Sequence, residues 1–177
     1  MTSNGLEALI IVALGANLPG ELNRPRQNLE KALVEMRTEH IHPVERSHWW
    51  RSAAWPDPSQ PDYINGVALV ETTLSPRDVL AALHRIEARL GRVRLGANAA
   101  RTLDLDLIAY GREVISEPDL ELPHPRAAQR LFVMGPLAQL APDWTHPVSG
   151  VTARSLASCA TVGRDARPLS LDPPTWG

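Results

Sequence analysis

The chain has 177 residues, of which 44% are hydrophobic and 21% charged, and its formal net charge at pH 7 is -2. This length fits one ordinary domain with a single core, and the composition excludes an intrinsically disordered chain. The near-neutral charge argues against nucleic acid as a partner. We expect one domain over residues 1–160 and a loosely ordered tail over residues 161–177.

A single cysteine, Cys159, leaves no partner for an internal disulfide bond and no second thiol for a Cys-x-x-Cys zinc site. This usage predicts a reducing compartment. The N-terminal apolar run, residues 8–16 (ALIIVALGA), is too short to span a bilayer and follows Glu7 rather than a basic segment. We expect a cytoplasmic protein with neither a signal peptide nor a membrane anchor.

The first part of the chain is typical of a strand, a helix and two further strands. Residues 8–14 are rich in Ile, Leu and Val and end at Gly15, which predicts a buried strand. Residues 25–36 begin with proline and carry apolar residues at helical spacing. Residues 44–52 contain aromatic residues without helical periodicity, which predicts a strand, and residues 63–72 (YINGVALVET) alternate as a strand does.

A second helix and another strand follow. Ser75 and Asp78 have the spacing of a capping box, with Asp in place of the usual Glu or Gln, and the helical pattern stops at Gly91. Residues 101–111 (RTLDLDLIAYG) supply the next strand. The order β-α-β-β-α-β is the split β-α-β arrangement. We therefore predict an α+β fold in which helices cover an antiparallel sheet.

The remainder has weaker patterns. From residue 111 to about 129 we predict a proline-containing loop, then a helical region over 130–140 interrupted by Gly135 and Pro136. A short helix is predicted over 151–160. Beyond it no periodicity is visible, which is the reason for expecting a loose tail.

Two aspartates interrupt the leucines of the last predicted strand. Because side chains alternate along a strand, Asp104 and Asp106 point to one face and lie about 7 Å apart, while the leucines point to the other. Two such carboxylates can hold a hard cation such as Mg²⁺, and phosphate oxygens commonly complete the coordination shell of that ion. The alternative is an amphipathic strand with one wetted face.

Arginines precede the acidic strand. Arg92, Arg94 and Arg101 stand just before it, and arginines together with a cation are a common way to bind polyphosphate. By itself the run is also compatible with a solvated loop. Combined with the carboxylates, it favours a magnesium-nucleotide site.

The glycines near the N-terminus do not form a P-loop. Residues 15–22 (GANLPGEL) have the glycine spacing of that motif, but Glu21 and Leu22 stand where Lys and Ser or Thr are needed. A phosphate site in this chain must therefore be built from arginines and metal.

A later segment offers more polar side chains. Residues 122–132 (LPHPRAAQRLF) place His124, Arg126 and Arg130 beside two prolines, which fix the local backbone. A histidine there can donate to a phosphate oxygen or transfer a proton, or it can be an ordinary exposed loop residue. Phe132, taken alone, predicts core packing.

Five segments in this order resemble the 6-hydroxymethyl-7,8-dihydropterin pyrophosphokinase family of folate biosynthesis. The resemblance spans roughly residues 9–142, and its most specific part is the segment from Arg101 to Asp106. The segments are GANL, QPDYINGVALVET, RIEARLGRVR, RTLDLDLIAYG and LPHPRAAQRLFVMGPL.

The resemblance implies a ferredoxin-like core and a diphosphotransferase that moves the diphosphate of ATP to the hydroxymethyl group of the pterin, leaving AMP. Asp104 and Asp106 match ligands of two Mg²⁺ ions, and Arg92 and Arg101 match catalytic residues that close over the triphosphate. The implied ATP-binding set is His84, Glu87, Arg92, Arg94, Arg101, Leu107, His124 and Arg130.

For the pterin, the resemblance implies that Tyr63 and Phe132 sandwich the flat ring and that Asn65 reads its amide edge. Ser52 and Ala53 are expected to border the same pocket through their backbone. Tyr63 and Asn65 are two residues apart, so they share a strand face independently of the resemblance. Stacking and edge hydrogen bonds suit a polar heteroaromatic ring.

The chain also departs from the family. Before Arg101, residues 95–101 (LGANAAR) lack the tryptophan that many members carry in a longer loop. The alternative function is therefore a noncatalytic pterin- or nucleotide-binding relative with an impaired arginine loop. A ferredoxin-like RNA-binding module is a third hypothesis, but its aromatic strand motif and positive charge are missing. The oligomeric state is left open, with a monomer favoured.

Overall fold

The computed structural model describes residues 3–17, 23–54, 57, 59–90 and 103–169. Its centre is an antiparallel six-stranded sheet with the order β5-β1-β4-β3-β8, in which β2 also pairs with β4. The strands are β1 (Ile10–Ala16), β2 (His42–Arg46), β3 (Trp50–Ser52), β4 (Tyr63–Glu71), β5 (Asp104–Tyr110) and β8 (Arg167–Pro168). This arrangement confirms the predicted α+β, ferredoxin-like fold.

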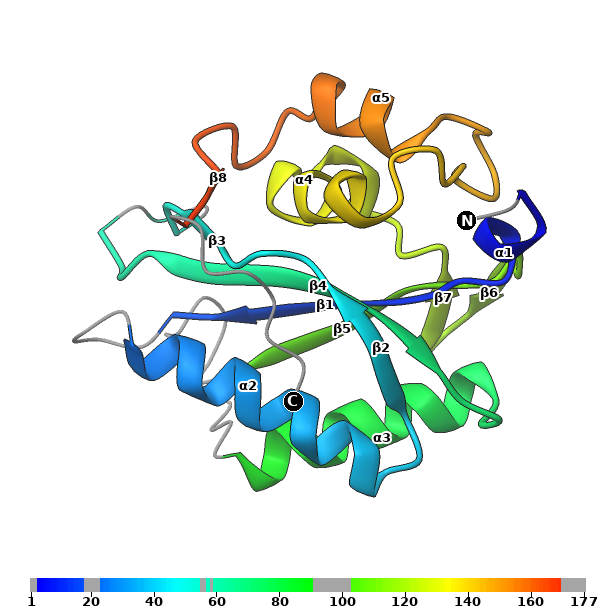
Figure 1. Cartoon of the computed structure of the whole chain (residues 1–177), viewed down its shortest axis with the longest axis horizontal. Coiled ribbons are helices and arrows are strands. Elements are labelled where there is room, and N and C mark those ends of the chain that lie inside the picture. The colour runs from blue at the N-terminus through cyan, green and yellow to red at the C-terminus, as the bar shows by residue number, and fades with distance from the viewer. Residues whose placement is uncertain (1–2, 18–22, 55–56, 58, 91–102, 170–177) are drawn as a thin grey trace.

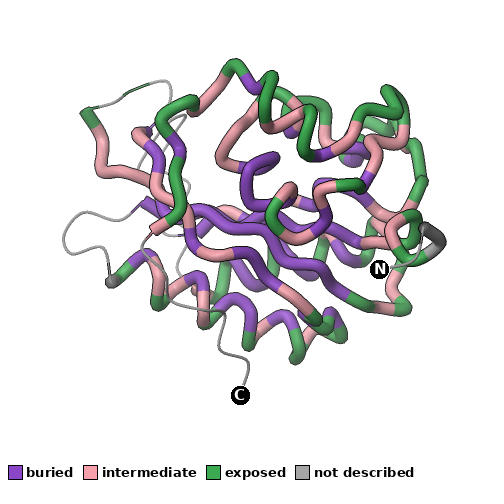
Figure 2. Tube along the Cα trace, turned by 45° about the horizontal axis from the view of Figure 1, so that its top comes forward, coloured by how far each residue is buried: buried purple, intermediate pink, exposed green. Residues whose placement is uncertain are grey.

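Helices cover both faces of the sheet (Figure 1). On one face lie α2 (Asn23–Thr38) and α3 (Pro76–Arg89), and on the other lie α4 (Leu131–Leu140) and α5 (Ala153–Cys159). Two apolar clusters therefore exist, one on each side of the sheet, and Figure 2 shows burial concentrated along the strands between them. None of the helices in the described part of the chain has the length and apolar composition that a transmembrane span requires.

The apolar residues predicted for the first two helices do form the core between those helices and the sheet. Leu29, Leu33 and Met36 of α2 pack with Leu83 and Ile86 of α3 against the sheet. The start of α3 also follows the sequence pattern, because the Ser75 side chain accepts a hydrogen bond of 3.2 Å from the backbone N–H of Asp78.

The predicted strand over 44–52 is divided into β2 and β3, which pair in turn with β4. At the break, the Ser47 hydroxyl accepts a hydrogen bond of 3.0 Å from the N–H of Val67, in place of a backbone carbonyl. The Trp49 ring lies over Gly66, where a Cβ would come within 2.6 Å of it. The prediction of a single strand was therefore wrong. At the break the Ser47 side chain takes the place of a backbone acceptor in the ladder with β4, and the Trp49 ring occupies the space above Gly66.

Five elements were not predicted: α1 (Ser3–Glu7), the hairpin strands β6 (Ile115–Glu117) and β7 (Leu120–Leu122), the short 3-10 helix η1 (Ala127–Gln129), and β8. All are short, so they contain too few residues to show a period. The expected interruption of the 130–140 helix is also absent, since α4 continues through Gly135 and Pro136. Gly135 instead makes room for the Trp50 ring, which would lie 2.6 Å from a Cβ there.

Residues 161–169, the described part of the segment expected to be a loose tail, pack against the fold. β8 pairs with β3, and the N–H of Leu169 donates to the carbonyl of Trp49 at 2.8 Å. The N–H of Leu131, at the start of α4, donates to the carbonyl of Val162 at 2.9 Å. Residues 170–177 lie outside the described residues.

Candidate active site

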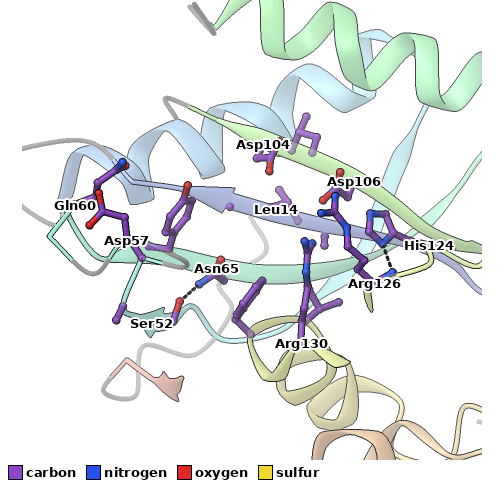
Figure 3. A pocket seen from close by; sticks show the side chains of 18 of the residues that line it. Leu14, Ser52, Asp57, Gln60, Asn65, Asp104, Asp106, His124, Arg126 and Arg130 are labelled. Carbon is purple, nitrogen blue, oxygen red and sulfur yellow. Dashed lines mark hydrogen bonds between the residues drawn. The ribbon is translucent and has the colours of Figure 1, made fainter. Parts of the chain in front are cut away.

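A cavity of about 370 Å³ lies on the α4 side of the sheet, where β1 ends and where β4 and β5 begin. Figure 3 shows side chains entering it from the strands, from the segment before α4 and from the loop after β3. Ten of the predicted site residues line it: Ser52, Ala53, Tyr63, Asn65, His84, Asp104, Asp106, His124, Arg130 and Phe132. Residues scattered over 80 positions of sequence are thus brought to one place by the sheet order and by α4.

The two aspartates occupy the predicted face of β5. Asp104 pairs in register with Gly15 and Asp106 with Ala13, so small residues of β1 form the floor beside the carboxylates. Leu105 and Leu107 are buried in the core on the opposite side. The alternation expected from the sequence is therefore present, and both carboxylates point into the cavity (Figure 3).

The donor set suits a magnesium ion that is shared with a phosphate. Two carboxylates on one strand face are hard oxygen ligands, and Mg²⁺ usually takes only one or two of them together with phosphate oxygens and water. Within the described part of the chain, no group of three His, Cys, Asp or Glu side chains is placed to hold a metal by itself. Asp104 and Asp106 fit a metal that arrives with a polyphosphate.

The other end of the cavity is suited to a flat polar ring. Asn65 is only 5% exposed and donates from Nδ2 to the Ser52 hydroxyl at 3.0 Å, which fixes the orientation of its amide. Tyr63 and Phe132 also line this cavity, so the aromatic residues and the amide expected from the sequence lie in one site. The arrangement offers both stacking surfaces and hydrogen-bonding groups.

His124 faces the carboxylate end as a neutral ring. Burial lowers its pKa, the nearby positive charges of Arg130 and Arg126 lower it further, and the negative charge of Asp106 acts in the opposite direction. Its Nδ1 accepts a hydrogen bond of 3.2 Å from the backbone N–H of Arg126. The ring proton therefore resides on Nε2, which makes His124 a hydrogen-bond donor toward the cavity.

Arginines flank the same space. Arg130 lies over the Phe132 ring, with its guanidinium carbon 5.7 Å from the ring centre, and thereby connects the two ends of the cavity. Arg126 enters the cavity near Asp106 and His124 (Figure 3). The sequence pointed to Arg126 as a polar loop residue but assigned it no role.

Two further polar lining residues were missed. Asp57 and Gln60 line the cavity from the proline-rich loop before β4. The Asp57 carboxylate accepts hydrogen bonds from the N–H and the hydroxyl of Ser59, at 3.0 and 2.7 Å, so it shapes its own turn. No periodicity distinguishes such loop positions, and nothing in the sequence alone would have indicated them.

Two residues of the implied ATP-binding set do not line the cavity. Leu107 is buried among the apolar residues on the opposite side of the sheet. Glu87 is 2% exposed, and its Oε1 accepts a hydrogen bond of 2.8 Å from the N–H of Leu105. Glu87 thus holds the edge strand β5 against α3, which is a structural contact the helical spacing could not predict.

The predicted basic residues Arg92, Arg94 and Arg101 lie outside the described residues. His84, by contrast, lines the cavity from α3. The helix therefore contributes one residue of the implied nucleotide set to the cavity.

Comparison with known proteins is consistent with this geometry. The family model for 7,8-dihydro-6-hydroxymethylpterin-pyrophosphokinase (HPPK) matches residues 11–142. The chain is 45% identical over 165 residues to a 2-amino-4-hydroxy-6-hydroxymethyldihydropteridine pyrophosphokinase of Synechocystis sp., covering 91% of this chain and 82% of the relative. A Haemophilus influenzae protein of the same name is 38% identical over 163 residues, covering 92% and 97%.

Solved structures show the same fold. The wild-type HPPK-DHPS of Plasmodium falciparum superposes with a TM-score of 0.65 over 88% of this chain, at 11% sequence identity. The chain spans 46% of that larger protein. At this low identity the likeness concerns the fold alone.

Proposed function

The chain belongs to the 7,8-dihydro-6-hydroxymethylpterin-pyrophosphokinase family, and from this premise we propose that it transfers the diphosphate of ATP to the hydroxymethyl group of 6-hydroxymethyl-7,8-dihydropterin. The products are AMP and the pterin diphosphate, an intermediate of folate biosynthesis. One observation carries the proposal. The carboxylates of Asp104 and Asp106 share a cavity with Tyr63, Asn65 and Phe132, so a polyphosphate and a flat ring can meet there.

The pterin binds at the aromatic end of the cavity. Tyr63 and Phe132 stack on its two faces, and the oriented Asn65 amide recognises the polar edge of the ring. The hydrogen bond from Asn65 to the Ser52 hydroxyl supports this role, because it leaves the amide little freedom to turn. An amide held in advance loses less entropy when the ligand binds.

The triphosphate binds at the carboxylate end. Asp104 and Asp106 would hold two Mg²⁺ ions there together with the phosphate oxygens. When bound, these ions offset the negative charge that develops on phosphate oxygens during transfer. The number of ions and the dependence on Mg²⁺ are part of this proposal.

His124, Arg130 and Arg126 bind and orient the phosphates. The neutral His124 donates from Nε2, because its Nδ1 is already engaged by the N–H of Arg126. Arg130 and Arg126 add positive charge at the same place. Arg92 and Arg101, with Arg94, are expected to complete the clamp from the segment beyond α3, and His84 contacts the nucleotide from that helix.

Transfer proceeds by direct attack. The hydroxymethyl oxygen of the pterin forms a bond to the β-phosphorus of ATP, the bond from that phosphorus to the α-phosphate oxygen breaks, and AMP leaves. The hydroxyl proton passes to solvent. His124 presents a donor rather than an acceptor to the cavity, and we assign Asp104 and Asp106 to the metal ions. Alignment and charge stabilisation are then the main contributions of the protein.

The test is to incubate the purified protein with ATP, MgCl₂ and 6-hydroxymethyl-7,8-dihydropterin and to quantify AMP, with a control lacking the pterin. Pterin-dependent AMP is the expected result. Pterin binding without AMP would favour the noncatalytic alternative, in which the loop over residues 95–100 has lost catalysis. The monomeric state and the cytoplasmic location remain predictions.

A further inference from the structure

The C-terminal segment over residues 160–169 contacts both walls of the pterin end of the cavity. One wall is formed by Ser52, the last residue of β3, and by Ala53, and the other is formed by Phe132 in the first turn of α4. β8 runs beside β3, while the N–H of Leu131 donates to the carbonyl of Val162. A single segment thus bridges two walls that come from distant parts of the sequence.

The first contact is made by Asp165. Its Oδ2 accepts a hydrogen bond of 2.6 Å from the backbone N–H of Ala53. Hydrogen bonds to an ionised carboxylate are short and about twice as strong as neutral ones. Asp165 therefore restrains the peptide between Ser52 and Ala53, two residues that line the cavity, without lining the cavity itself.

The second contact is made by Gly163. A Cβ at this position would lie 2.4 Å from Cδ1 of Phe132, so the ring packs directly on the glycine backbone. The φ angle of Gly163 is +67°, a conformation that L side chains rarely adopt. Both features require glycine, and together they fix how far the Phe132 ring can retreat from the cavity.

We propose that Asp165 and Gly163 are positioning residues for the pterin, which set the separation of the Ser52–Ala53 backbone from the Phe132 ring. The inference rests on the proposed function, because it assigns the pterin to this end of the cavity. Neither residue touches the nucleotide end in the described structure. Loss of the Asp165 contact is therefore expected to affect pterin binding selectively. A shift of the Phe132 ring also reaches Arg130, which lies over it, so Gly163→Ala is expected to weaken pterin binding with a smaller effect on ATP.

The test compares Asp165→Ala, Asp165→Asn and Gly163→Ala with wild type, using equilibrium titrations of 6-hydroxymethyl-7,8-dihydropterin and, separately, of ATP with Mg²⁺. Asp165→Ala should weaken pterin binding about five- to tenfold, the effect of losing one charge-assisted hydrogen bond. ATP affinity should change less than about twofold. Asp165→Asn keeps an acceptor oxygen and should restore most of the pterin affinity.

Asp143→Ala is the matched control. The Asp143 carboxylate is exposed and pairs only loosely with Arg154, at 3.4 Å. This variant should bind both ligands as wild type does. Gly163→Ala should weaken pterin binding through the displaced ring, which tests the second wall independently of the first.

The outcomes separate the two proposals. Unchanged pterin affinity in both Asp165→Ala and Gly163→Ala overturns the positioning role, as does an equal loss of pterin and ATP affinity in Asp165→Ala, which would indicate general damage. A wild-type protein that binds the pterin but forms no AMP overturns the proposed reaction while leaving the positioning role supported by selective loss in the variants.

Discussion

Asn65 on β4 lies directly across from Gly15 on β1, and a Cβ on Gly15 would come within 3.3 Å of the Asn65 Oδ1. The same hypothetical Cβ would lie 3.8 Å from Cδ1 of Tyr63. The absence of a side chain at Gly15 therefore leaves the space that Asn65 and Tyr63 occupy at the pterin end of the cavity. If a side chain is added at Gly15, the group that must move is the Asn65 amide, which we expect to recognise the pterin ring.

We predict that Gly15→Ala weakens pterin binding about tenfold, because the Asn65 amide must shift by a few tenths of an ångström and strain its bond to Ser52. ATP affinity should stay within about twofold. Isothermal titration with each ligand measures both. A variant that binds the pterin as wild type does would mean that Asn65 adapts at no cost.

Asp106→Asn should lower kcat for AMP formation at least about 100-fold while the fold remains intact. The substitution keeps the shape of the side chain but removes the charge that a metal ligand needs. A larger Mg²⁺ concentration should be required for half-maximal activity. Steady-state assays across a Mg²⁺ series, with circular dichroism of the variant, make the measurement.

Asp119→Asn is the matched control for that experiment, since Asp119 is an exposed residue between β6 and β7 and lies away from the cavity. Its kcat should equal that of wild type. If Asp106→Asn retained wild-type kcat and the same Mg²⁺ requirement, the metal role of Asp106 would be lost.

The sequence predicted the carboxylate end of the site better than its surroundings. Asp104 and Asp106 were predictable because strand alternation is a local rule, and the structure keeps that alternation. Asp165 was not predictable, because its contact with Ala53 joins residues 112 positions apart in a segment without periodicity. The expectation of a loose tail rests on the same lack of periodicity.

Glu87 shows a different limit of sequence reasoning. Its helical spacing from His84 suggested a shared face, yet His84 lines the cavity and Glu87 is buried against β5. A helix face is about 100° wide or more, so spacing alone does not separate a cavity-lining position from a neighbouring core position. The partner, the N–H of Leu105, becomes visible only when the edge strand is in place.

We predict that Glu87→Ala lowers the free energy of unfolding by about 1–3 kcal/mol, because the buried N–H of Leu105 loses its acceptor. Glu87→Gln, which keeps an acceptor oxygen, should lose less. Urea denaturation measures both. The ATP affinity of the folded Glu87→Gln variant should be close to that of wild type. A loss of ATP affinity of about tenfold or more would instead indicate that Glu87 takes part in nucleotide binding.

We predict that His146, which does not line the cavity, makes the free energy of unfolding decrease at acidic pH. Burial and the charge of Arg112 lower its pKa below the ordinary value of 6.5. Its Nδ1 accepts hydrogen bonds of 3.3 Å from the N–H groups of Val148 and Ser149, which a protonated ring could not do. The folded state therefore favours the neutral ring.

As the pH falls below about 6.5, the unfolded chain binds a proton at His146 before the folded protein does, so the free energy of unfolding must fall. Solvent screening at this half-buried ring keeps the loss below about 1 kcal/mol per pH unit. His146→Asn supplies an acceptor that does not titrate, so its stability should fall less between pH 6.5 and pH 5. Urea denaturation of both proteins at several pH values measures the difference. Equal slopes would show that His146 titrates alike in the folded and unfolded states.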